Sequence, residues 1–132
     1  TIVSTKENIE KLKEFEPMWK LSQFDSNYLQ AALDDKLFKN LSKEINIKNK
    51  IELENILRNS SLIEEIFESS ANYVLVKLKN LSAKEFQEKL KPYKIMVRDC
   101  SNFDYLNSSD VRIAVKSSSA NEILQRALKE IC

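Results

Sequence analysis

Apolar side chains in the first part of the chain recur every three or four positions, which is the spacing of one face of an α-helix. Thr5 is suited to cap a first helix, and Pro17 interrupts that helix because proline cannot donate an interior helical hydrogen bond. Ser22 or Asp25 is expected to cap a second helix that ends near Leu33. We therefore expect this part of the chain to form short connecting helices.

A longer helix is predicted from Asp34 to about Arg58, because the helical spacing restarts there and ends at the polar run that begins with Asn59. The candidates for burial along this helix are Leu37, Leu41, Ile45, Ile51, Ile56 and Leu57. The first helix carries a short apolar stripe of Ile9, Leu12 and Phe15, and the second presents Phe24, Tyr28, Ala31 and Ala32.

The period changes to two after residue 62, which is the spacing of a β-strand. Residues 62–68 are expected to be extended and residues 72–78 to form a strand. The two faces of that strand carry Val74, Val76 and Leu78 on one side, and Tyr73 and Leu75 on the other. The remaining predicted elements are a helix opened by the capping box Ser82–Glu85, a strand at 95–98, a polar loop at 99–110, a strand at 111–116, and a last helix opened by the capping box Ser119–Glu122.

This order of elements predicts an α+β fold, with a small and mainly antiparallel sheet, helices packed on one face, and a long helix before it. We expect residues 1–132 to form a single domain. Its parts are the connecting helices at 1–33, the long helix at 34–58 and a β-β-α-β-β-α core at 62–132.

Composition narrows the possible functions mainly through what is missing. The 132 residues carry 21 basic and 20 acidic side chains, and this balance gives no basic surface for nucleic acid or anionic membrane. No apolar run approaches the length of a membrane span. The chain contains no glycine and no histidine, so glycine-rich phosphate loops, serine–histidine–aspartate catalysis and histidine-based zinc sites are excluded.

Cys100 and Cys132 are too few for a disulfide framework, so we expect a reducing, cytoplasmic setting. Cys100 also lacks the histidine that usually activates a nucleophilic thiol. No metal site is expected.

Two arginines on the predicted strands are the candidate binding residues. In the run 111–115 the period of two sends the β-branched residues to one face and Arg112 to the other, beside the small Ala114. The planar fork of a guanidinium in that position is suited to bind a carboxylate. Arg98 ends the preceding strand and is expected to share one cleft with Arg112. The alternative from the residues alone is two surface arginines, paired with Asp99 and Asp110.

The chain resembles the C-terminal small domain of fold-type-I aminotransferases, in the branch that contains histidinol-phosphate aminotransferase and threonine-phosphate decarboxylase. The stretches that carry this resemblance, in the family's order, are Glu7–Leu12, Phe15–Trp19, Ala31–Leu33, Ser70–Val76, Ile95–Phe103 and Val111–Lys116. The resemblance implies that Arg112 binds the α-carboxylate of the substrate and that Arg98 helps to hold its anionic end. Asn72 lies in a recurrent family segment and is carried as a third substrate-binding candidate. Trp19 and Phe103 are expected to be buried packing residues rather than cleft residues.

The chain departs from the family pattern in two ways. Tyr93-Lys94 and Asp104-Tyr105 stand where the family often has glycine, so the positive-φ turns expected there lose the residue that favours them. The family's Ser-x-x-Lys motif, whose lysine holds pyridoxal phosphate, would precede Thr1. We therefore expect a fragment that has no catalytic or cofactor-binding residue of its own, binds no cofactor alone and is inactive alone.

Three hypotheses follow. In the first, the full-length protein is a pyridoxal-phosphate-dependent aminotransferase that transfers an amino group between an amino acid and a 2-oxo acid, and the resemblance implies a homodimer. In the second, it decarboxylates a phosphorylated amino acid such as threonine phosphate, using the same arginines. In the third, the chain is a free-standing α+β regulatory or interaction module.

Overall fold

The structure is a computed structural model that describes residues 3–16 and 21–132, and it divides into two compact units, Thr1–Lys39 and Asn40–Cys132. Helices α1 (Lys6–Lys13) and α2 (Gln23–Asp34) belong to the first unit. The Thr5 hydroxyl accepts a hydrogen bond from the Asn8 N–H, which confirms the predicted cap. Ser22 caps α2 and Asp25 completes its capping box, so both predicted positions contribute. The predicted interruption at Pro17 lies outside the described residues.

Helix α3 (Phe38–Arg58) begins later than the predicted Asp34. The reason is local, because Asp35 ends α2 and its carboxylate accepts hydrogen bonds from the N–H groups of Leu37 and Phe38. Only the last turns of α3 are buried, at Leu53, Ile56 and Leu57. The expectation of burial is wrong for the other candidates along the predicted helix, which are exposed in the described chain: Leu37, Leu41, Ile45 and Ile51.

A four-stranded antiparallel sheet forms the centre of the second unit. Its order is β1-β2-β4-β3, and its strands are β1 (Ile63–Ile66), β2 (Tyr73–Leu78), β3 (Arg98–Asp99) and β4 (Asp110–Ala114). The predicted strand at 95–98 is shortened to the two residues of β3, which pair with Arg112 and Val111 of β4. The predicted antiparallel sheet is therefore confirmed, with a short strand at one edge.

Two further helices lie between and after the strands. Helix α4 (Ala83–Leu90) carries the predicted capping box of Ser82 and Glu85 and continues into the 3-10 turn η1 (Lys91–Tyr93). Helix α5 (Ser118–Ile131) is capped by Ser117, whose hydroxyl accepts a hydrogen bond from the Ala120 N–H, so the predicted cap at Ser119 is wrong. Ser119 instead lies inside the first turn of the helix.

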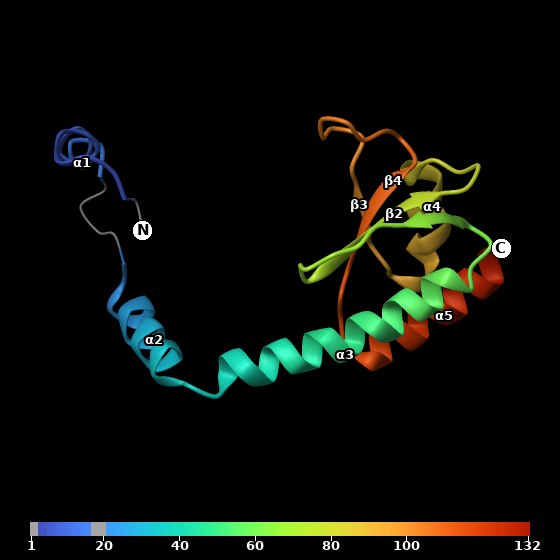
Figure 1. Ribbon diagram of the computed structural model, residues 1–132, viewed down its shortest axis with the longest axis horizontal. Helices are drawn as coiled ribbons and strands as arrows, with labels where there is room; N and C mark the ends of the chain where they lie inside the picture. Colours follow the sequence, from blue (N-terminus) through green and yellow to red (C-terminus); the bar gives the residue numbers. More distant parts are fainter. Residues whose placement is uncertain (1–2, 17–20) are drawn as a thin grey trace. The chain divides into compact units, whose positions relative to one another are not determined.

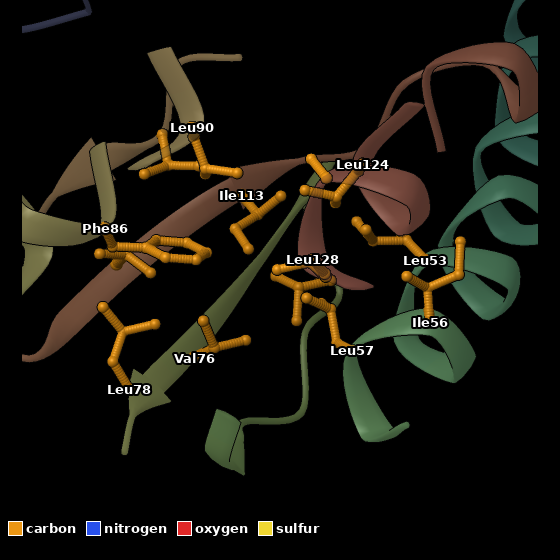
Figure 2. Close-up of a cluster of buried hydrophobic side chains, with 14 of the residues drawn as sticks. Leu53, Ile56, Leu57, Val76, Leu78, Phe86, Leu90, Ile113, Leu124 and Leu128 are labelled. Carbon is orange, nitrogen blue, oxygen red and sulfur yellow. The ribbon is translucent and has the colours of Figure 1, made fainter. Parts of the chain in front are cut away.

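One face of the sheet forms the hydrophobic core together with α3, α4 and α5. The side chains that meet there are drawn in Figure 2: Leu53, Ile56 and Leu57 of α3, Phe86 and Leu90 of α4, Leu124 and Leu128 of α5, and Val76, Leu78 and Ile113 of the sheet. Helix α5 runs alongside the second half of α3 (Figure 1), and the Asn121 side chain donates to the Asn49 carbonyl across this contact at 3.1 Å. The α+β fold with helices on one face of the sheet is thus confirmed.

Candidate substrate-binding site

Arg112 lies on the face of the sheet opposite to the core. Its neighbours Val111 and Ile113 are buried at 0% and 5% exposure, and Arg112 itself is partly exposed, as the period of two predicts. Leu75 of β2 is its partner across the strands on one side, and Arg98 of β3 is its partner on the other. The structure therefore brings the two predicted arginines next to each other on one face.

Arg98 is more exposed than Arg112. Its Nη2 donates a hydrogen bond to the Asn102 side-chain oxygen at 3.3 Å, and no carboxylate in the described part of the chain forms an ion pair with it. Like charges directly across two strands repel each other, so this pair costs stability unless an anion lies between them. The arrangement is therefore suited to bind an anion.

Two aromatic rings lie against the guanidinium groups. The Cζ atom of Arg112 is 4.2 Å from the ring centre of Tyr73 and 5.6 Å from that of Phe103. The Cζ atom of Arg98 is 5.7 Å from the same Phe103 ring. Phe103 is 40% exposed, so its expected role as a buried packing residue is wrong, and the ring belongs to the arginine face. Trp19 lies outside the described residues.

The aspartates named as alternative partners have other contacts. Hydrogen bonds from Ser101 lower the pKa of Asp99 below its usual range, and Asp110 is buried and accepts a hydrogen bond from the Asn107 N–H at 2.7 Å. The Nε atom of Arg112 is buried and has no hydrogen-bond partner in the described residues. A buried donor without a partner is uncommon, and here it leaves Arg112 with unused hydrogen-bonding capacity.

Asn72 lies just before β2, and its backbone carbonyl accepts a hydrogen bond from the Val115 N–H at 2.9 Å. Its side chain is exposed and makes no hydrogen bond within the described part of the chain. The structure thus places Asn72 just before the strand that carries Tyr73, without a hydrogen bond to either arginine among the described residues.

Both turns at which glycine is missing still adopt the left-handed conformation. Lys94 has φ 58° and ψ 31°, and Tyr105 has φ 67°. The Lys94 N–H donates to the Lys91 carbonyl at 2.9 Å, which closes the turn that leads toward β3. A residue with a Cβ atom costs roughly 1–2 kcal/mol in the left-handed conformation, so each of these two turns lowers the stability of the folded chain.

The other reactive side chains near this face have structural roles. Burial raises the pKa of the Cys100 thiol, which keeps it protonated and argues against a nucleophilic role. Lys77 of β2 pairs with Glu64 at 3.0 Å, and this hydrogen bond and charge raise its pKa. Within the described ranges, no cluster of acidic or cysteine side chains is arranged to hold a metal ion. None of the described helices combines the length and the apolar character that crossing a membrane requires.

Known proteins resemble this chain over nearly its whole length. Residues 1–131 match the family model of aminotransferase class I and II. Histidinol-phosphate aminotransferase from Methanocaldococcus jannaschii is 33% identical over 129 residues, which cover 98% of this chain and 34% of that protein. A putative threonine-phosphate decarboxylase from Caldanaerobacter subterraneus subsp. tengcongensis is 32% identical over 124 residues, which cover 92% of this chain and 33% of that protein.

A solved structure shows the same relationship. The histidinol-phosphate aminotransferase from Clostridium acetobutylicum superposes with a TM-score of 0.86 at 29% identity, over 96% of this chain and 38% of that one. The chain thus spans about a third of the length of the curated relatives it matches. With the family model matched from residue 1 to residue 131, the chain belongs to the class I and II aminotransferases.

Proposed function

We propose that this chain is the substrate-binding, C-terminal small domain of a pyridoxal-phosphate-dependent aminotransferase that resembles histidinol-phosphate aminotransferase. The full-length protein would transfer an amino group between an amino acid and a 2-oxo acid. The observation that carries this proposal is the Arg112 guanidinium, which lies beside Arg98 on a partly exposed sheet face and has no carboxylate partner among the described residues. The family match over nearly the whole chain favours an enzyme over a free-standing module.

In this proposal Arg112 binds the substrate α-carboxylate through two parallel N–H···O bonds, which hold the substrate in one orientation. Arg98 binds the other anionic end, and its hydrogen bond to Asn102 leaves further N–H donors free. Asn72 offers an exposed amide at the start of β2 and would contact the substrate from that end. Substrate binding would also relieve the repulsion between the two arginines.

Lys77 does not fit the role of a lysine that bonds to pyridoxal phosphate. A lysine that bonds to this cofactor needs a neutral, desolvated amine, whereas Lys77, the lysine on the arginine face of β2, has a raised pKa and pairs with Glu64. Pyridoxal phosphate supplies an electron sink for the substrate when it is bound. We therefore place the cofactor and its lysine in the remainder of the full-length protein, and we expect this chain to be inactive without that remainder.

The experiment is the Arg112→Ala substitution in the full-length protein. Glutamate binding should weaken by roughly tenfold to a hundredfold, because the hydrogen bonds between Arg112 and the α-carboxylate are lost, while the absorption of the bound cofactor stays unchanged. Arg112→Lys should also weaken binding, because an ammonium group cannot form the two-pronged contact. Arg126→Ala is the matched control, since Arg126 is an exposed arginine on α5. Unchanged affinity in Arg112→Ala would refute the proposal.

Decarboxylation of threonine phosphate is the second candidate, and the 32% identity to a putative threonine-phosphate decarboxylase is the observation that favours it. The same two arginines would bind that substrate. Offering the full-length protein histidinol phosphate with a 2-oxo acid, and separately threonine phosphate, distinguishes the candidates. Amino-group transfer supports the first, and release of carbon dioxide from threonine phosphate supports the second.

The proposal extends to the location, the oligomeric state and the domain organisation of the full-length protein. We propose a cytoplasmic enzyme that forms a homodimer and acts on small amino acids and 2-oxo acids, with no role in binding nucleic acid or membrane. Within it, residues 1–132 would form one domain with the core at 62–132, the long helix at 34–58 and the connecting helices at 1–33. Gel filtration of the full-length protein tests the dimer.

A further inference from the structure

We infer that Tyr73 is a positioning residue for Arg112, and that the face of its ring holds the guanidinium where a carboxylate would otherwise hold it. This inference rests on the proposed function of Arg112. Tyr73 itself is not expected to contact the reacting atoms, because it acts through the arginine.

The sheet register explains how the two side chains meet. Leu75 is the direct partner of Arg112, and Tyr73 is the direct partner of Ala114, so Tyr73 and Arg112 are diagonal neighbours on one face of the sheet. Long and aromatic side chains reach each other across such diagonals. Because Ala114 is small, it leaves the space above it open, and the Cζ atom of Arg112 lies 4.2 Å from the Tyr73 ring centre.

Stacking on an aromatic ring leaves the N–H donors of a guanidinium free, whereas an ion pair occupies them. A cation is attracted to the face of an aromatic ring by the ring quadrupole, which uses the face of the guanidinium. The N–H donors point outward in the guanidinium plane and remain free for a substrate carboxylate. An internal carboxylate would instead occupy those donors and compete with the substrate.

The surroundings of Arg112 favour this role over general packing. Its Nε atom is buried without a hydrogen-bond partner in the described residues, and its Cζ atom lies closer to the Tyr73 ring than to the Phe103 ring. The Tyr73 hydroxyl makes no hydrogen bond with the described residues. The ring face and not the hydroxyl should therefore carry the effect. Phe103 is farther from Arg112, at 5.6 Å, and it is shared with Arg98, so its contribution should be smaller.

The test is a double-mutant cycle in the full-length protein, with glutamate as the probe, because it carries an α-carboxylate, and with its dissociation constant as the measurement. Tyr73→Leu should weaken binding by about fivefold to thirtyfold, the range of a partly desolvated cation–π contact. In the Arg112→Ala background the same substitution should change binding by less than about twofold, because the group that Tyr73 positions is gone. Tyr73→Phe should retain the affinity of the unmodified protein.

Controls separate positioning from stability and from the proposed function. Tyr28→Leu removes an exposed aromatic ring from α2 and should leave binding unchanged. If Tyr73→Leu does not fold, Tyr73→Met fills similar space without a ring and is expected to behave as Tyr73→Leu does. An equal effect of Tyr73→Leu with and without Arg112, or a loss of affinity in Tyr73→Phe, would overturn the inference. Unchanged affinity in Arg112→Ala alone would instead refute the proposed function.

Discussion

Replacing Lys94 by glycine should stabilise the protein. Lys94 sits in the left-handed region at φ 58° and ψ 31°, directly after η1, and its side chain is exposed. Glycine lacks the Cβ atom that makes this region unfavourable, and its N–H can still donate to the Lys91 carbonyl, now at 2.9 Å. The substitution thus removes strain without removing a buried contact.

The size of the effect follows from two opposing contributions. Relief of the left-handed conformation gains roughly 1–2 kcal/mol in the folded state. The greater freedom of glycine in the unfolded chain offsets this by roughly 0.4–1 kcal/mol. The difference between these two ranges spans about 0–1.6 kcal/mol, so the free energy of unfolding should increase by about 0.8 kcal/mol, the middle of that span. For a unit the size of Asn40–Cys132, this raises Tm by roughly 2–8 °C.

The assay is thermal and urea unfolding of the chain and of its variants, with Lys91→Gly as the matched control. Lys91 is an exposed lysine three residues earlier with φ −56° and ψ −41°, a right-handed conformation that glycine does not favour. Lys91→Gly should therefore lower the stability by about 0.5–1 kcal/mol. If both substitutions shift stability in the same direction, or if Lys94→Gly destabilises, the strain argument is refuted.

Two further predictions concern helix caps. Ser117→Ala should destabilise α5 by about 1 kcal/mol, whereas Ser119→Ala should have little effect, because only Ser117 accepts the Ala120 N–H; urea unfolding compares them, and equal losses would contradict the assignment. Hydrogen bonds from Ser82 lower the pKa of Glu85, so its stabilisation is present above the ordinary glutamate pKa of about 4.3 and is lost as the pH falls through the lower pKa of the folded state. Glu85→Gln should therefore make stability less dependent on pH between about 5 and 3, and an unchanged profile would exclude the capping box as a source of acid sensitivity.

Local signals predicted most of what positions the site. The period of two in the strands at 72–78 and 111–116 separates core residues from the face that carries Tyr73 and Arg112, and both strands show this separation. The capping box at Ser82 likewise depends on residues three positions apart. Such features are encoded within a few residues, so no tertiary information is needed to recognise them.

Features that depend on distant partners could not be predicted in the same way. The apolar stripe of α3 continues through Leu41 and Ile45, but burial requires a facing surface, and within the second unit that surface lies beside the last turns only. Phe103 lies in a polar loop without periodicity, so nothing in its neighbours indicated that its ring would lie against two guanidiniums. Ser117 and Ser119 lie two positions apart, and both are residue types that cap helices. Which of them caps α5 depends on where the backbone enters the helix, and the sequence alone does not give that position.

Three departures from the usual local rules occur together near Arg112. Two arginines face each other across β3 and β4, a buried Nε has no partner among the described residues, and the loop that supplies Phe103 turns through a left-handed tyrosine. Each of these lowers the stability of the folded chain, and such costs persist in natural sequences mainly where a function requires them. A bound anion offsets the repulsion between the two arginines, because it places negative charge between them. It also supplies hydrogen-bond acceptors to the other N–H donors of the Arg112 guanidinium. The third departure lies in the loop that carries Phe103, whose ring contacts both cations. The same face therefore gains stability when a substrate anion binds, which is what a substrate-binding surface requires.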